Sequence, residues 1–384
     1  MGDPGARGIS PSSNRFDPET LLAGILDWVR EESPSYDTQA VSRMLAKVEA
    51  AFAGLPARFR RYPGEGGYAD LLEISLTGGN GNPNAPGILV LGHVDTVHPV
   101  GTLASELPIR RDGDRVYGPG ILDMKSGLYL AVHALRELYA ADKLPSLPVT
   151  FLIVPDEEVG SPTTRQRIED EARRHRYVLV PEPTREGKVV TGRHAFARYK
   201  IRTLGAPAHA GADNRNGRSA ISRMAAVIQA IEDRSDYDRG LTYSVGIVKG
   251  GTFVNVVPTE CEAEVLCVAP DNDALLEITE TMSALADQDV TVEPGPVRPL
   301  FAPSTGGLEL FAKARAIGAT LGVELEHGQF GGGSDGNFTG ALGIPTLDGL
   351  GPIGAGPHTY DEHILVSSLS SRCQILAGLL ETLE

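Results

Sequence analysis

The sequence contains only three cysteines among its 384 residues. Cys261, Cys267 and Cys373 are odd in number, and no two of them have the CxxC spacing that thiol redox and zinc motifs use. This disfavours a disulfide-stabilised secreted scaffold, and we expect a reducing, cytoplasmic location. Cys261 and Cys267 fall in one predicted strand, where a role as small core residues is the simplest interpretation.

Positive charge is also scarce, because 35 Lys and Arg face 50 Asp and Glu and give a formal net charge of −15. Nucleic-acid phosphates require a basic surface, so we expect no nucleic-acid partner. No apolar run approaches the roughly 20 residues that cross a bilayer, so we expect no membrane-spanning segment. A solvated acidic surface explains most of the acidic excess, although part of it could be gathered at a site that holds cations.

Length and composition predict a globular protein with two folding units. The chain is longer than a typical domain, and its 41% hydrophobic and 22% charged residues are ordinary for a globular protein. Residues 1–15 are rich in Gly, Pro and Ser and contain no apolar stretch. We therefore expect a disordered tail at residues 1–15.

The first half of the chain alternates predicted helices and strands. Apolar spacing predicts a pair of helices between residues 17 and 52 and another helix at 127–139. Continuous apolar runs at residues 88–91, 149–154 and 177–180 are typical of strands that are covered on both faces. Strands that alternate with helices indicate βαβ units and a mostly parallel sheet.

The pattern changes near Gly192. Residues 196–203 alternate between polar and apolar as a half-exposed strand does. Further strands and two helices are predicted after it, at 219–231, 243–248, 260–268, 273–285 and near 290. An antiparallel sheet covered by a helical pair would form a compact second domain, which we place at residues 192–302.

After the second domain the earlier pattern resumes. Helices are predicted at residues 307–321 and 366–380, with an apolar run at 344–347. The predicted fold class is therefore α/β, with a mostly parallel sheet in a domain of residues 16–191 plus 303–384. The α+β domain of residues 192–302 is inserted into it.

Polar residues that can bind metals follow several of the apolar runs. The five candidates are scattered along the chain: His93, Asp123, Glu158, Glu182 and His358. The carboxyl ends of parallel strands meet at one edge of a sheet, so these side chains can converge there. Two imidazoles and three carboxylates can hold two divalent ions such as zinc, manganese or cobalt, provided that one carboxylate bridges them.

The residues beside these candidates suggest further roles. Asp95 lies two positions after His93 on the same face of an extended segment, where its carboxylate can accept the second imidazole N–H. Glu157 and Glu158 are adjacent at the end of a buried strand, where two carboxylates are costly unless a cation compensates them. Glu158 can then serve as a ligand and Glu157 as a general base. Asp123 directly precedes a predicted helix, so it could instead be an N-cap.

Eight stretches between residues 92 and 363 resemble, in order, the M20-type dinuclear metallohydrolases. That family includes glutamate carboxypeptidases, acetylornithine deacetylases and succinyl-diaminopimelate desuccinylases. The stretches are GHVDTVHPVG, GPGILDMKSGL, PDEEVGS, PEPT, HAGADNRNGRSAI, GGTFVNVVP, GGGSDGNF and GPHTYDEH. The resemblance implies that His93, Asp123 and Glu182 hold one metal and that Asp123, Glu158 and His358 hold the other, with Asp123 bridging.

The resemblance also implies roles for other residues. Glu157 matches the general base and Asp95 its ligand-orienting partner. The inserted domain matches a lid that forms a homodimer and carries His209 into the active site of the other subunit. Substrate contacts are implied for a lid asparagine and for a turn at 331–335, here Asn255, Gly332, Gly333 and Ser334.

One position departs from the family pattern. Carboxypeptidase and deacylase members of the family usually carry an arginine thirteen residues beyond the lid asparagine, where it pairs with the carboxylate of the substrate. Here that position is Val268. Either Arg193, His194 or Arg198, which are near in sequence, replaces this arginine, or the substrate has no carboxylate there.

These observations favour one function and leave two alternatives. The favoured function is metal-dependent hydrolysis of a C–N bond in a small molecule, an amide or an N-acyl amino acid, by a hydroxide that bridges the metals, with Glu157 as the general base. The first alternative is an aminohydrolase that releases ammonia from an electron-poor arylamine, as in the nitroanthranilate aminohydrolase relatives of the family. The second is a non-catalytic binding protein on the same scaffold.

Overall fold

The computed structural model describes residues 15–79, 82 and 85–384, which form two compact units. The first unit contains the described part of Met1–Val190 together with Thr305–His327 and Ile344–Glu384. The second contains Thr191–Ser304 and Gly328–Gly343. The predicted tail at residues 1–15 lies outside the described residues except for Arg15.

The second unit differs from the predicted inserted domain by one additional segment. Residues 328–343 were expected to belong with the catalytic domain, but they are hydrogen-bonded within the second unit. The backbone N–H of His194 donates to the carbonyl of Phe330, and the side-chain amide of Asn337 donates to the carbonyls of His194 and Pro299. These bonds join residues more than thirty positions apart, which a local sequence pattern does not reveal.

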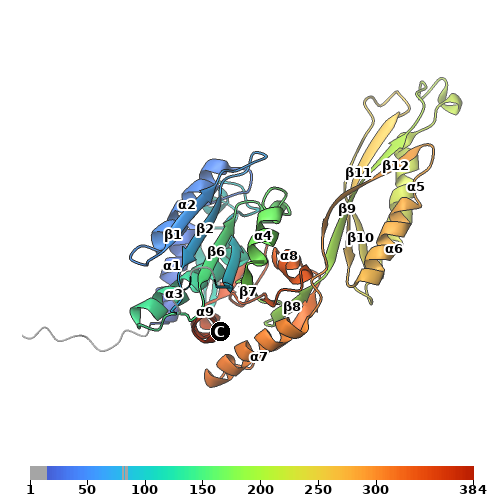
Figure 1. The fold of residues 1–384 in the computed structure, drawn as a ribbon. Helices are drawn as coiled ribbons and strands as arrows, with labels where there is room; N and C mark the ends of the chain where they lie inside the picture. The colour runs from blue at the N-terminus through green and yellow to red at the C-terminus, as the bar shows by residue number, and fades with distance from the viewer. Residues whose placement is uncertain (1–14, 80–81, 83–84) are drawn as a thin grey trace, which may run out of the picture. The chain divides into compact units, whose positions relative to one another are not determined.

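A six-stranded mixed sheet forms the centre of the first unit (Figure 1). Its order is β1-β2-β6-β3-β7-β14. Strands β6, β3, β7 and β14 are parallel to one another, whereas β2 is antiparallel to both β1 and β6. The strand bounds are Arg58–Tyr62 for β1, Leu71–Leu76 for β2, Gly87–His93 for β3, Val149–Val154 for β6, His175–Leu179 for β7 and Thr346–Leu347 for β14.

The burial of these strands explains which of them the sequence predicted. All residues of β3 and β6 are buried, and both strands coincide with predicted apolar runs. The antiparallel strand β1 reads Arg-Phe-Arg-Arg-Tyr and is mostly exposed, so it gives no apolar run and was not predicted. A mixed α/β fold with several sheets is thus confirmed.

A smaller four-stranded sheet in the first unit has the order β15-β16-β5-β4. Its strands are only two or three residues long, which is too short for a periodic sequence pattern to predict them. Their bounds are Arg110–Asp112 for β4, Arg115–Tyr117 for β5, Gly354–Ala355 for β15 and His363–Leu365 for β16.

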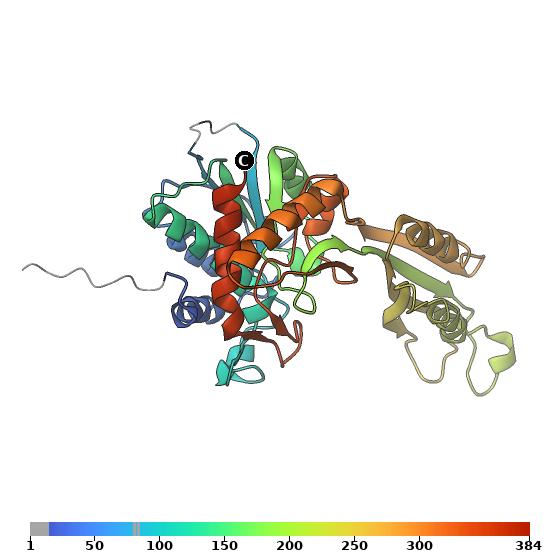
Figure 2. The same ribbon diagram turned by 90° about the horizontal axis from the view of Figure 1, so that it is seen from below.

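The helices of the first unit other than α4 bury their apolar faces in one common core. Helices α1 and α7 each lie against α9, and α3 also contacts α9 (Figure 2). Asp17 and Asp37 cap α1 and α2 by accepting the backbone N–H of Thr20 and Ala40, as the N-cap preference for aspartate predicts. The bounds are Pro18–Val29 for α1, Thr38–Ala51 for α2, Ser126–Ala140 for α3, Arg165–Ala172 for α4, Thr305–Thr320 for α7 and Val366–Thr382 for α9.

The second unit is built on an antiparallel four-stranded sheet with the order β10-β11-β9-β12. Alternate residues of β9 are buried, and helices α5 and α6 lie side by side on that face of the sheet (Figure 1). The bounds are Ala195–Leu204 for β9, Ala220–Glu232 for α5, Thr242–Gly250 for β10, Glu260–Ala269 for β11, Asn272–Ser283 for α6 and Val290–Arg298 for β12.

The remaining elements are short. Strands β8 (Val189–Arg193) and β13 (His327–Phe330) form a two-stranded sheet, and helix α8 covers Gly336–Ala341. Single turns of helix are present at η1 (Thr102–Ala104), η3 (Glu157–Val159) and η4 (Asn214–Asn216), and the irregular helical turn η2 covers Ile121–Lys125.

Candidate metal centre

The five predicted ligands all belong to the first unit, where three of them lie at the carboxyl ends of adjacent parallel strands. His93 is the last residue of β3, Glu158 lies in η3 after β6, and Glu182 follows β7 by three residues. Asp123 comes from η2 and His358 from the loop between β15 and β16. Strand order therefore brings together residues that are far apart in the sequence.

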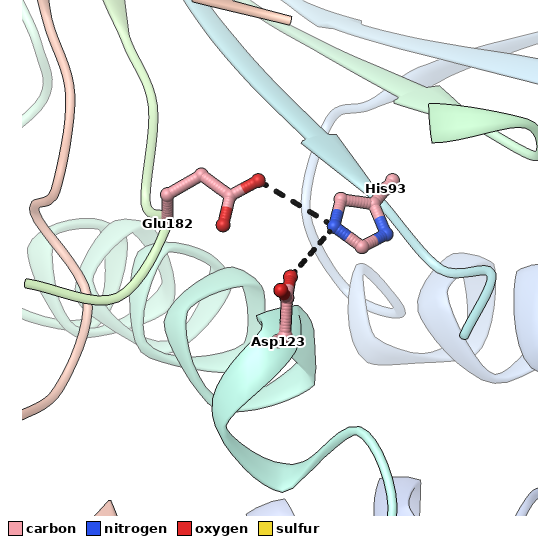
Figure 3. A group of neighbouring side chains, drawn as sticks. All are labelled: His93, Asp123 and Glu182. Atoms are coloured by element: carbon pink, nitrogen blue, oxygen red, sulfur yellow. Dashed lines mark hydrogen bonds and ion pairs between the residues drawn. The ribbon is translucent and has the colours of Figure 1, made fainter. Parts of the chain in front are cut away.

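The first group consists of His93, Asp123 and Glu182 (Figure 3). His93 Nε2 lies 3.1 Å from Asp123 Oδ1 and 3.5 Å from Glu182 Oε1. The ligand atoms of these three residues all lie within 4.8 Å of one another. All three side chains are buried, so they form a shielded set of nitrogen and oxygen donors.

The second group consists of Asp123, Glu158 and His358. His358 Nε2 lies 3.0 Å from Glu158 Oε2 and 3.3 Å from Asp123 Oδ2. Because Oδ1 of Asp123 faces His93 and Oδ2 faces His358, the same carboxylate belongs to both groups. This is the geometry that a bridging ligand needs.

The alternative role of Asp123 as an N-cap is wrong. Helix α3 begins at Ser126 after Lys125, and no side chain forms a capping hydrogen bond there. Asp123 itself has φ −111° and ψ 102°, outside the helical region. Its carboxylate contacts the two histidines instead of a helix N-terminus.

Asp95 connects the first group to the loop that carries Glu157. Its carboxylate accepts the backbone N–H groups of Glu157 and Glu158 at 3.3 and 3.2 Å. His93 Nδ1 lies 2.9 Å from the backbone carbonyl of Asp95 and 3.4 Å from its carboxylate, so the closer acceptor for this N–H is the carbonyl. Asp95 is fully buried, and it therefore orients both the imidazole and the two adjacent glutamates.

Ser35 is a member of this network that the sequence analysis did not identify. Its hydroxyl donates to Asp95 Oδ2 at 2.7 Å across sixty positions of sequence. Its backbone N–H donates to the carbonyl of Thr96. A Ser-Pro-Ser segment after a helix looks like an ordinary loop, so no local signal pointed to Ser35.

Burial and mutual repulsion change the protonation of the carboxylates. Burial, with the nearby charge of Asp123, raises the pKa of Glu158 to about 8 and that of Glu182 to about 7. Hydrogen bonds to Asp123 and Glu158 raise the pKa of His358 to about 11. Burial alone would raise the pKa of Asp123, but contacts with His358 and His93 hold it well below its usual range.

These shifts show that the site retains protons when no cation neutralises it. Burial opposes a charge on His93, but hydrogen bonds to Asp123, Asp95 and Glu182 outweigh burial and raise its pKa well above its usual value. Divalent cations would take the place of these protons and compensate the buried carboxylates. The donor set of two imidazoles and three carboxylates therefore fits a pair of divalent ions.

Two of the predicted substrate contacts in the second unit have structural partners. Arg193 is fully buried, and its Nη1 donates to the carbonyls of Gly332 and Gly333 at 2.9 and 3.3 Å. Ser334 is also buried, and its hydroxyl oxygen accepts the backbone N–H of Gly336. These bonds shape the turn at 331–335.

His194 differs from Arg193, its neighbour in sequence. Its Nδ1 is buried without a hydrogen-bond partner among the described residues, and burial lowers its pKa. The imidazole is therefore held as a neutral group.

His209 and Asn255 lie together on the exposed part of the second unit. The backbone N–H of Ala210 donates to the carbonyl of Asn255 at 2.9 Å. His209 Nδ1 accepts the backbone N–H groups of Gly211 and Ala212, which leaves Nε2 as the protonated donor nitrogen. The implied contact of His209 with the other subunit stays a prediction.

Val268 lies in a row of residues across the open face of the second sheet. It pairs with Phe196 of β9, and Phe196 pairs in turn with Arg298 of β12. The side chain of Arg298 is 11% exposed, with Nη2 3.8 Å from Asp335 Oδ1. Arg298 is the last residue of β12 and was not among the residues predicted from the sequence.

An α/β sheet with such a set of metal-binding side chains at its strand ends is typical of metal-dependent hydrolases. Residues 89–382 match the model of Peptidase family M20/M25/M40. The chain belongs to this family, whose enzymes use divalent metal ions and act on amide and peptide bonds. The predicted resemblance is thus confirmed.

Individual relatives support this assignment. Carboxypeptidase G2 of Pseudomonas sp. (strain RS-16) is 32% identical over 315 residues, which cover 79% of this chain and 74% of that protein. Succinyl-diaminopimelate desuccinylase of Verminephrobacter eiseniae is 28% identical over 325 residues, which cover 77% of this chain and 78% of that protein.

A solved structure supports the fold. The crystal structure of aminopeptidase PepT from Bacillus cereus matches with a TM-score of 0.74 over 96% of this chain and 99% of that chain, at 21% identity. Among the described residues, no helix combines the length and the apolar character that crossing a bilayer would require.

Proposed function

We propose that this protein hydrolyses the amide bond of a small N-acyl amino acid or peptide at a centre of two divalent ions. The observation that carries the proposal is the pair of three-ligand groups that share Asp123, one oxygen in each. Bound divalent ions at such a centre make water acidic enough to supply a nucleophile near neutral pH.

Glu157 is the proposed general base. It lies next to the ligand Glu158, is 9% exposed, and its backbone N–H is held by Asp95. A small contribution of its charge to the raised pKa of Glu158 and of Glu182 supports this assignment. Glu157 would take the proton of the attacking water and deliver it to the departing nitrogen.

Arg298 is the proposed partner for a carboxylate of the substrate. It lies in the same cross-strand row as Val268, the position at which the family resemblance implied an arginine. Arg193 is less suitable because it is fully buried and its guanidinium donates to two backbone carbonyls, whereas the side chain of Arg298 is 11% exposed. The names of carboxypeptidase G2 and of the desuccinylase are consistent with a substrate that carries a carboxylate.

We further propose a homodimer formed through the second unit. Strand β10 is an edge strand of its sheet, and most of its residues are exposed. Phe253 and Val254, in the loop that follows, are 73% and 102% exposed. An open strand edge beside exposed apolar side chains favours association with a second copy, which sedimentation or light scattering can measure.

The test of the function uses protein stripped of metal and reloaded separately with zinc, manganese or cobalt. Free amino acids are measured with N-acyl amino acids and dipeptides, and ammonia is measured with arylamines. We expect metal-dependent release of amino acids and no ammonia. Ammonia from an arylamine would support the aminohydrolase alternative instead, and a protein that binds no divalent ion would contradict both.

A further inference from the structure

A buried carboxylate that belongs to neither ligand group lies directly behind Asp123. Glu362 is 1% exposed and follows His358 by four positions. Its Oε1 accepts the backbone N–H groups of Leu122 at 2.8 Å and of Asp123 at 3.0 Å. Its Oε2 accepts the backbone N–H of Gly120 at 3.0 Å.

His98 supplies a fourth contact to the same carboxylate. Its Nε2 lies 3.0 Å from Glu362 Oε2, and its side chain is 5% exposed. An ionised carboxylate only accepts hydrogen bonds, so the imidazole donates here. Three backbone N–H groups and one imidazole therefore surround one buried carboxylate, and hydrogen bonds to a carboxylate are shorter and stronger than those between neutral groups.

The contacts of the Glu362 side chain lie at the end of the backbone hydrogen bonding between β5 and β16. Strands β5 and β16 pair from Arg115 to Tyr117, and the backbone N–H of Gly118 then donates to the carbonyl of Glu362. Beyond this point the chain turns at Gly120, whose φ is +67°, so regular strand pairing ends. The side chain of Glu362 takes over as the acceptor for the next N–H groups.

We propose that Glu362 is a positioning residue of the metal centre. Its carboxylate joins the segment that carries Asp123 to the segment that carries His358 and so sets the spacing of two ligands of the second group. His98 in turn orients the carboxylate of Glu362. This inference rests on the proposed function, because it presumes that the two groups bind divalent ions.

A purely structural role is the competing explanation, and Glu32 provides a matched control. Like Glu362, Glu32 accepts two backbone N–H groups with separate oxygens, those of Gly101 and Leu103, both at 2.8 Å. The loop that it holds carries none of the five ligands. Glu362→Gln and Glu32→Gln therefore each disturb a carboxylate that supports backbone, but only the first should disturb a ligand.

The experiment titrates metal-free wild type, Glu362→Gln and Glu32→Gln with Co²⁺, following heat and the visible absorption of the bound ion. Wild type should bind two ions per chain. Loss of a residue that orients a ligand typically weakens metal binding 10- to 100-fold, and we expect a loss of about this size for one ion in Glu362→Gln, with an altered absorption spectrum. Glu32→Gln should keep both affinities within about twofold and keep the spectrum, because it leaves the ligand geometry intact.

The outcomes separate this inference from the proposed function. A wild type that binds fewer than two ions contradicts the function itself. If wild type binds two ions and Glu362→Gln binds them with the same affinities and the same spectrum, the positioning role of Glu362 is overturned and the proposed function is not. If Glu362→Gln does not fold, the same titration is made with His98→Ala and His98→Gln. We expect His98→Ala to bind one ion more weakly and His98→Gln to recover this affinity, because its side-chain amide can still donate to Glu362. Equal metal affinities in the two His98 variants would overturn the positioning role.

Discussion

The two units position their functional residues in different ways. In the first unit, each part of the metal centre is held by long-range contacts: Ser35 and Glu157 meet at Asp95, and Glu362 holds the backbone of Asp123. In the second unit, His209 is held by neighbours two and three positions away. The candidate metal ligands are therefore held within the core, whereas His209 depends on exposed local structure, which can change without loss of the fold.

This comparison predicts that changes in the first unit act on kcat or on metal binding, while changes in the second act on KM. The largest effect is expected for Glu157→Gln, because removing a general base typically lowers the rate about 10²- to 10⁴-fold. Steady-state kinetics should show this loss in kcat, with metal content equal to that of wild type. Glu19→Gln, which removes only a surface ion pair with Arg111, serves as the control and should change kcat less than about twofold. A Glu157→Gln variant with full activity would contradict the proposed mechanism.

The next largest effect is expected on the stability of the fold when the metal ions are removed, and this loss of stability should depend on pH. Folding raises the pKa of Glu158 to about 8 and that of Glu182 to about 7, from 4.5 for an ordinary glutamate. Between these values the folded metal-free protein binds more protons than the unfolded chain, so its stability falls as the pH rises from about 4.5 to 8.

The stability of the metal-loaded protein should not fall in this way as the pH rises, because cations take the place of the protons at the carboxylates. Each ion stabilises the fold by about 2.7 kcal/mol when its free concentration is 100 times its Kd. Thermal unfolding at pH 5.5 and 8.5, with and without chelator, should show that the difference in Tm between the two forms is larger at pH 8.5. A difference that shrinks at the higher pH would contradict the assigned protonation.

A smaller effect of a different kind is expected for Arg298→Ala in the second unit. A hydrogen bond to a charged group contributes about 1.5 to 3 kcal/mol, so KM should rise roughly 10- to 100-fold while kcat changes little. Arg298→Lys should recover only part of this loss because an ammonium group cannot bind a carboxylate through two parallel bonds. Arg202→Ala, on an exposed face of β9, is the control. An unchanged KM in Arg298→Ala would contradict the proposed contact between Arg298 and a carboxylate of the substrate.

The smallest effect is expected for Ser35→Ala, which removes one hydrogen bond to Asp95. A loss of about 1 kcal/mol corresponds to a decrease of about fivefold in kcat, with KM unchanged. Ser42→Ala, which removes a hydroxyl bonded to a carbonyl of its own helix, should leave kcat unchanged. If both variants behave alike, Ser35 does not act through Asp95.

Residues that lie within periodic segments could be predicted without the structure. The apolar runs of β3 and β6 predicted buried strands because both faces of these strands are covered. The five candidate ligands stood out in the sequence because they directly follow such runs or lie in short turn motifs. The edge strand β1 gave no such signal because arginines occupy both of its faces.

The sequence by itself determined the types of residue at the metal centre, since these ligands and the adjacent glutamate are recognisable from their local neighbours. Only the tertiary structure showed that Asp123 has one carboxylate oxygen in each group and does not cap a helix, and that Ser35 contacts Asp95 and His98 contacts Glu362. The physical reason is distance along the chain: Glu362 holds the N–H of Asp123 across 239 positions. A hydrogen bond between such distant residues leaves no periodicity in the sequence, because the folding of the sheets alone brings its partners together.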